Sequence, residues 1–255
     1  TTNKQIFKIS NSKFNAKSAT EAEALQYFAK IGSISCIDYC AELNMALGVH
    51  LMIEAAEYGQ LAVLKHLREK NCPWEADVCA RAASSGHLDC LIYLHDSGCP
   101  WDSLACEAAI RSNNLQILTY LSENNCPWGE DSIRKAARYS IECLRYALAH
   151  DCPTGYSANY LCAEAAEAGY LDCLKFLREK GYPLGRSCAF AARGGHLSCL
   201  KYAHEHGGEW GDTVSFASRA GHSACLKYAL QNGAEVGGYG IMTIACYSGS
   251  VECVK

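Results

Sequence analysis

Seventeen of the 255 residues are cysteines, and thiols are the side chains in this sequence with the most chemistry to offer. Cysteine can form disulfides, bind metal ions as thiolate, or act as a small apolar residue in a protein core. An odd number of cysteines cannot all pair within one chain. The positions of the cysteines therefore have to decide among these three interpretations.

The cysteines recur at a fixed period. One column has a cysteine followed by an apolar residue and, three positions on, an aromatic ring; it contains Cys36, Cys90, Cys143, Cys173, Cys199 and Cys225. Val63 and Ile117 occupy the same place in two intermediate copies, and Cys253 begins a last copy. Successive members lie 26 to 30 residues apart, and such a period is typical of a solenoid built from repeats.

Two more columns accompany the first. The second contains Cys79, Cys106, Cys162 and Cys188, with Ile133 and Val214 as substitutes, and the third contains Cys72, Cys99, Cys126 and Cys152. Valine and isoleucine cannot replace a metal-binding thiolate, so we expect no metal site and no cofactor. Stacked helices lie about 8–10 Å apart, beyond the roughly 7 Å Cα limit for a disulfide within a column. We predict buried, reduced cysteines and an intracellular, reducing compartment. The cytoplasm is the favoured compartment and an organelle interior is the alternative; a few disulfides between columns also stay open.

Each repeat predicts two short helices, as residues 81–101 illustrate. Apolar residues recur there at helical spacing. Gly86 is placed to end the first helix and Gly98 the second, because glycine tolerates a positive φ, and Pro100 prevents continuation. Such short helices are unstable alone in water, so neighbouring repeats must bury their apolar faces.

The run Ala-Ala-x-x-Gly-His-Leu at 82–88 and 191–197, with the ending Gly-Ala-Glu-Val at 233–236, resembles the ankyrin repeat. The period of about 27 residues is shorter than the usual 33, which corresponds to a short type without the β-hairpin finger. The resemblance implies an all-α, ankyrin-like helical-pair solenoid of eight to nine short repeats over residues 21–255. Residues 1–20, with four lysines and no acidic residue, are expected to be a basic non-repeat segment.

The copies are uneven in four places. Asn113 stands in the turn position of Gly86, and the copy around Ser140 is one residue shorter. Three extra residues fall in the stretch 154–161, where we expect a wider loop. The last copy stops at Lys255 in mid-helix, so we expect either a longer natural chain or a partner that covers this C-terminal edge.

Enzyme signatures are absent: the sequence contains no nucleotide-binding glycine loop, no H-E-x-x-H and no G-x-S-x-G. His204-Glu205-His206 lies at the C-terminal end of a predicted helix. The helix dipole favours positively charged side chains there, so the two histidines do not require a metal ion. Histidine recurs at the repeat turn, as His87, His196 and His222. This recurrence predicts that each of them makes a structural hydrogen bond at its turn. A fourth column, expected to pack loops on the core, contains Trp74, Trp101, Trp128 and Trp210, with Thr154, Leu184 and Val236 as substitutes.

The net charge and the length of the apolar runs limit the classes of partner that this sequence can bind. A net charge of −4 argues against nucleic acid, and no apolar run reaches the roughly 18 residues of a membrane span. The four lysines of residues 1–20 leave −8 on the remaining chain.

By the resemblance to ankyrin repeats, the end of each first helix faces the concave surface. The candidate binding residues there are Glu54, Tyr58, Arg81, Arg111, Lys135, Arg138, Tyr139, Phe190, Arg193, Phe216 and Arg219. Six of them, all arginine or lysine, predict a basic stripe on an otherwise acidic protein. Arginine and aromatic residues are common hot spots of interfaces. The alternative is a helix face that is only solvated.

The predicted function is a non-catalytic protein–protein interaction adaptor or scaffold. The alternative is a structural or linker subunit embedded in a larger multiprotein assembly, including one inside an organelle.

Overall fold

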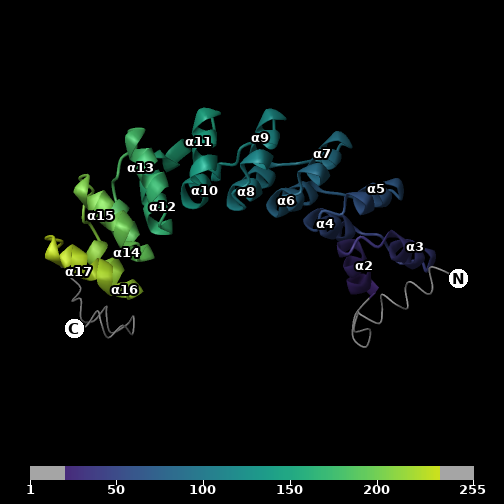
Figure 1. Cartoon of the computed structure of the whole chain (residues 1–255), viewed down its shortest axis with the longest axis horizontal. Helices are drawn as coiled ribbons and strands as arrows, with labels where there is room; N and C mark the ends of the chain where they lie inside the picture. Colours follow the sequence, from purple (N-terminus) through teal and green to yellow (C-terminus); the bar gives the residue numbers. More distant parts are fainter. Residues whose placement is uncertain (1–20, 236–255) are drawn as a thin grey trace. The chain divides into compact units, whose positions relative to one another are not determined.

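Pairs of short helices joined by turns and loops make up residues 21–235, the range that the computed structural model describes (Figure 1). This range contains sixteen α-helices, one 3₁₀ helix and no strand. The predicted all-α helical-pair fold is therefore confirmed, with eight pairs inside the described range. The predictions for residues 1–20, for Val236 and Cys253 and for the chain end fall outside that range.

The helices divide into two compact units, with the boundary between Trp128 and Gly129. The first unit contains α2 (Glu21–Lys30), α3 (Ile34–Glu42), α4 (Val49–Glu57), α5 (Leu61–Glu69), α6 (Ala76–Ser85), α7 (Leu88–Asp96), α8 (Ser103–Arg111) and α9 (Leu115–Glu123). The second contains α10 (Ser132–Tyr139), α11 (Ile141–Ala149), η1 (Gly155–Asn159), α12 (Leu161–Ala168), α13 (Leu171–Glu179), α14 (Ser187–Gly194), α15 (Leu197–Glu205), α16 (Thr213–Ala220) and α17 (Ser223–Gln231).

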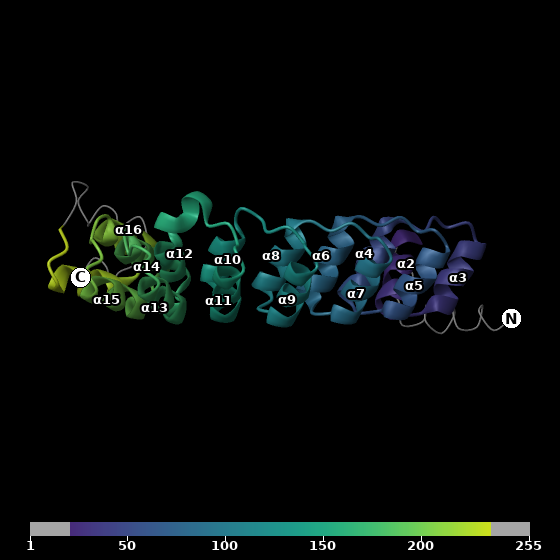
Figure 2. The same cartoon turned by 90° about the horizontal axis from the view of Figure 1, so that it is seen from above.

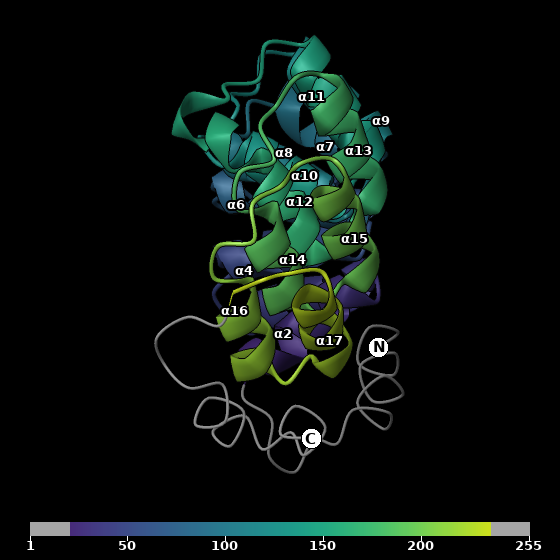
Figure 3. The same cartoon turned by 90° about the vertical axis from the view of Figure 1, so that its left-hand side faces the viewer.

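Within each unit the helices form two layers (Figure 2). The even-numbered helices, which we call first helices, contact one another in sequence, as α4, α6 and α8 do in the first unit. The odd-numbered second helices form the other layer, seen for α13, α15 and α17 in Figure 3. Each first helix also packs on the second helix of its own repeat.

The cysteine columns form the core between these helices. All fifteen cysteines of residues 21–235 are buried with free thiols, and in the first column Val63 and Ile117 are buried equally well. Burial raises the thiol pKa, to about 12 for Cys90 and Cys173. Cysteine thus serves here as a small apolar residue, as the interchange with valine and isoleucine predicts.

The third column adds a hydrogen bond to this packing. The thiol of Cys72 donates to the carbonyl oxygen of Gly48 at 3.3 Å, and that of Cys126 donates to Asp102 at 3.2 Å. Gly48 and Asp102 are the N-cap residues of α4 and α8, the first helices of the same repeats. In these repeats the thiol therefore links the closing loop to the start of its own repeat.

The helix ends follow the sequence signals. Gly86 ends α6 in the left-handed region with φ 85°, and Gly98 after α7 has φ 82°. Asn113 takes the same conformation with φ 52°, which confirms its place as the turn residue. Asparagine is among the few residues that adopt this region readily, so the turn survives the loss of glycine.

The two irregular copies also have a local explanation. Ser140 ends α10 and caps α11 at once, because its hydroxyl accepts a hydrogen bond from the Cys143 amide at 3.0 Å. Ser140 alone therefore connects the two helices, and the repeat is one residue shorter. The stretch with three extra residues forms the 3₁₀ helix η1 in the loop before α12.

The histidine of each turn packs on the glycine of the preceding repeat. His87 donates a hydrogen bond from Nε2 to the Glu57 carbonyl oxygen at 3.2 Å, and its ring covers Gly59, where a Cβ would lie 2.6 Å from Nδ1. The rings of His196 and His222 cover Gly169 and Gly195 in the same way. The predicted structural hydrogen bond is confirmed for His87.

The buried thiols predict slow chemical labelling. With a pKa of about 12, roughly one in ten thousand of the Cys90 and Cys173 thiols is ionised near pH 8, and burial blocks access to all fifteen described cysteines. We expect the fifteen described cysteines to resist iodoacetamide in the native protein and to react fully in guanidinium chloride, as read by mass spectrometry of their peptides. Fast labelling of the native protein, or several disulfides, would contradict the core described above.

Two glycines provide a matched test of the repeat turn. Gly59 and Gly98 both have positive φ, but only Gly59 is covered by a histidine, and a Cβ at Gly98 meets nothing within 4 Å. Gly98→Ala should lower the free energy of unfolding by about 1 kcal/mol through backbone strain. Gly59→Ala should cost about 1–2 kcal/mol more, because the His87 ring must move and lose its hydrogen bond.

Urea unfolding of both variants measures the difference. In a His87→Ala background the two glycine substitutions should cost about the same, since the ring that distinguishes them is gone. An equal loss for both glycines in the presence of His87 would show that the histidine contact does not hold the turn.

Candidate functional site

The eleven candidate residues lie on first helices or directly after one, and all are at least partly exposed. We call this surface the first-helix face. In the first unit its members lie on α4, at the end of α4, on α6 and on α8; they are Glu54, Tyr58, Arg81 and Arg111. In the second unit they lie on α10, α14 and α16; they are Lys135, Arg138, Tyr139, Phe190, Arg193, Phe216 and Arg219.

In the first unit two of the predicted arginines border one shallow depression. This depression, of about 300 Å³, lies between α6 and α8. It is lined by Asp77, Ala80, Arg81, Ser84, Leu104, Ala108 and Arg111. The Arg81 guanidinium lies 3.7 Å from Glu57 and 3.6 Å from Asp77, so carboxylates share the surface with it.

In the second unit the cations alternate with two glutamates of α12. Arg138 contacts Glu164 at 2.5 Å and Glu167 at 3.0 Å, and Arg193 contacts Glu167 at 2.5 Å. The hydrogen bond that Arg138 donates to Glu164 is the largest of the effects that raise the pKa of Arg138. The sequence predicted a basic stripe, whereas this part of the face is a network of mixed charge that joins three neighbouring first helices.

Beside this network lies an aromatic pair held between two guanidinium groups. The rings of Phe190 and Phe216 meet edge to face with centroids 6.4 Å apart. Arg193 lies 4.4 Å from the centroid of Phe190, and Arg186 lies 5.8 Å from Phe190 and 6.0 Å from Phe216. The sequence reasoning missed Arg186, which precedes α14 and is held by Asp212 at 2.5 Å.

The densest histidine cluster has structural partners. His204 stacks on Trp210 with centroids 4.2 Å apart and bonds the Tyr228 hydroxyl at 3.1 Å. His206 stacks on Tyr202 and donates to its carbonyl oxygen at 2.8 Å. Over residues 21–235 no group of three or more histidine, cysteine, aspartate or glutamate residues is arranged to hold a metal ion.

One family matches part of the sequence. Residues 162–204, which run from α12 into α15, match the family model described as ankyrin repeats (many copies). The predicted resemblance is thereby confirmed for this segment, and the other described repeats have the same order of first helix, turn, second helix and loop. A search of curated proteins finds no match.

The family defines a class of function. Ankyrin repeats are in general modules for protein–protein interaction and are generally non-enzymatic. Among the described helices, none combines the length and the apolar character needed to cross a membrane.

The charge network predicts a cost for removing its central carboxylate. Glu167 contacts two arginines from neighbouring repeats, so Glu167→Gln should lower the free energy of unfolding by about 1 kcal/mol, and salt should reduce the difference. Urea unfolding at low and high salt measures it. The exposed Glu209 in the loop before α16 supplies the control, because Glu209→Gln should change little; equal effects of the two variants would contradict a network centred on Glu167.

Proposed function

We propose that this protein is a non-catalytic adaptor or scaffold that binds a protein partner through its first-helix face. The observation that carries the proposal is the partly exposed pair of Phe190 and Phe216 between the guanidinium groups of Arg186 and Arg193. Aromatic and arginine side chains are the types that contribute most to interface affinity.

The geometry favours recognition with little rearrangement. Each arginine is already fixed by a carboxylate, Arg186 by Asp212 and Arg193 by Glu167. Side chains that are ordered before binding lose less conformational entropy when the partner arrives. The face therefore offers a preformed apolar spot with charged surroundings.

The partner should match this chemistry. A segment with an apolar side chain to cover the phenylalanine pair and acidic groups to meet the exposed Arg219 fits the surface. The glutamates of α12 favour a segment that also carries a cation. We therefore propose a partner segment of mixed charge in place of a purely acidic one.

Two further proposals accompany this function. The fifteen buried, free cysteines support a reducing compartment. The alternative role as a subunit fixed in a larger assembly rests on residues 1–20 and on the C-terminal edge, which lie outside the described residues, and it stays a prediction.

A matched pair of double variants tests the proposal. Phe216→Ala with Arg219→Glu alters an aromatic and a cation three residues apart on the first helix α16. Lys227→Glu with Leu230→Ala alters an exposed cation and an exposed apolar residue at the same separation on the second helix α17. Both variants should keep the helical circular dichroism of the parent.

The readout is quantitative mass spectrometry of proteins that cross-link to each form of the full chain in the source cells. We expect the α16 variant to lose the specific partners by about tenfold, a change of about 1.4 kcal/mol, while the α17 variant retains them. Retention of partners by the α16 variant would move the binding site elsewhere. The absence of any specific partner would contradict the adaptor role itself.

A further inference from the structure

Two repeats fill the space between neighbouring second helices with a tryptophan from their closing loop. Trp101 stacks on His95 with centroids 3.8 Å apart and meets the ring of Tyr120, in the next repeat, edge-on at 6.2 Å. Trp210 stacks on His204 at 4.2 Å and meets Tyr228 in the same way at 6.2 Å. In both repeats the histidine and the next repeat's tyrosine thus form a site that holds an indole ring, and we call this site the indole seat.

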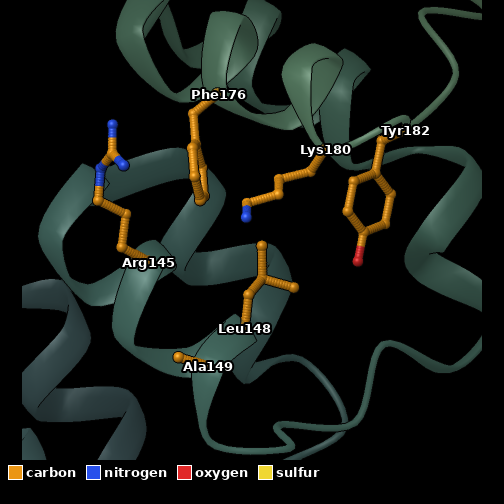
Figure 4. A pocket seen from close by; sticks show the side chains of 6 residues that line it. All are labelled: Arg145, Leu148, Ala149, Phe176, Lys180 and Tyr182. Carbon is orange, nitrogen blue, oxygen red and sulfur yellow. The ribbon is translucent and has the colours of Figure 1, made fainter.

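The repeat that begins its column at Cys143 lacks the indole. Counted along the repeat, Thr154 stands where the others have tryptophan, Leu148 where they have histidine, and Phe176 where they have tyrosine. Leu148 and Phe176 line an open pocket of about 410 Å³ between α11 and α13 (Figure 4). The pocket therefore lies where the register of the repeat calls for an indole that the chain itself does not supply.

The walls of this pocket combine an apolar floor with two cations. Its lining is Arg145, Leu148, Ala149, Phe176, Lys180 and Tyr182. The Arg145 guanidinium lies 4.2 Å and the Lys180 ammonium 5.7 Å from the centroid of the Phe176 ring. Figure 4 shows Lys180 extending between Phe176 and Tyr182, with its ammonium group above Leu148. The six lining residues include no carboxylate.

A cation in the position of Arg145 is not peculiar to this repeat. Lys201 has the same place in the repeat and lies 5.6 Å from the centroid of the Tyr228 ring, where Trp210 fills the seat. The difference is the missing indole, together with the second cation, Lys180. Charge and an open apolar seat occur together only at this one of the three compared positions.

We propose that this pocket binds an aromatic side chain of a partner protein, from a segment in which an acidic residue adjoins the aromatic one. The ring would take the place that Trp101 and Trp210 occupy in their own repeats, packed against Leu148 and Phe176. The neighbouring carboxylate would contact Arg145 and Lys180. The pocket lies in the layer of second helices, so this proposal goes beyond the first-helix face and does not depend on it.

Titration of the full chain with short peptides tests the proposal. The probe is acetyl-Asp-Trp-Asp-amide with a fluorine label on the indole, followed by fluorine NMR. We expect saturable binding in the millimolar range, and binding about tenfold weaker for the analogue acetyl-Lys-Trp-Lys-amide. Acetyl-Asp-Ala-Asp-amide should fail to displace the probe. Equal binding of the acidic and basic peptides, or no binding of the acidic one, would overturn the proposal.

Variants of the chain locate the binding. Thr154→Trp restores the chain's own indole and should abolish binding of the probe. Arg145→Glu with Lys180→Glu changes only exposed side chains and should weaken binding about tenfold even if the altered loop of the first variant fails to fold. Lys201→Glu is the matched control, which should leave binding unchanged. Undiminished binding by the Arg145–Lys180 variant, or a loss with Lys201→Glu, would show that the peptide binds elsewhere.

Discussion

The structure depends on the burial of short helices against their neighbours. The α-helices described have only eight to ten residues each, a length at which a helix is marginal in water even with a favourable sequence. Alanine, cysteine and leucine on their inner faces are removed from solvent by the adjacent repeats. Each repeat therefore owes its helices to the repeats beside it, and small core residues let the helices approach closely enough.

This constraint separates the residues that build the scaffold from those that can recognise a partner. The buried position of the first column holds cysteine, valine or isoleucine, as Val63 and Ile117 show, and burial raises the pKa of its thiols, as for Cys90. The exposed positions are free to differ from one repeat to the next. The aromatic pair of α14 and α16 and the pocket between α11 and α13 both arise where two neighbouring repeats depart from the shared pattern.

The sequence was sufficient for features that are local or periodic. The columns of cysteine predicted the core, and Gly86, Gly98 and Asn113 predicted the helix ends, because a turn that needs positive φ leaves its mark on one residue. The contacts of Arg138 with Glu164 and Glu167 were not predictable in this way. They join side chains 26 to 29 residues apart, and their formation depends on the distance between helices that the sequence does not state.

The pocket between α11 and α13 was not predicted from the sequence, although Thr154 interrupts the column of tryptophans there.

Circular dichroism of one isolated helix pair, residues 76–98 under reducing conditions, tests most directly whether the helices depend on their neighbours. We predict a largely unfolded peptide beside a strongly helical full chain. A peptide with the helix content that α6 and α7 have in the protein would contradict this dependence.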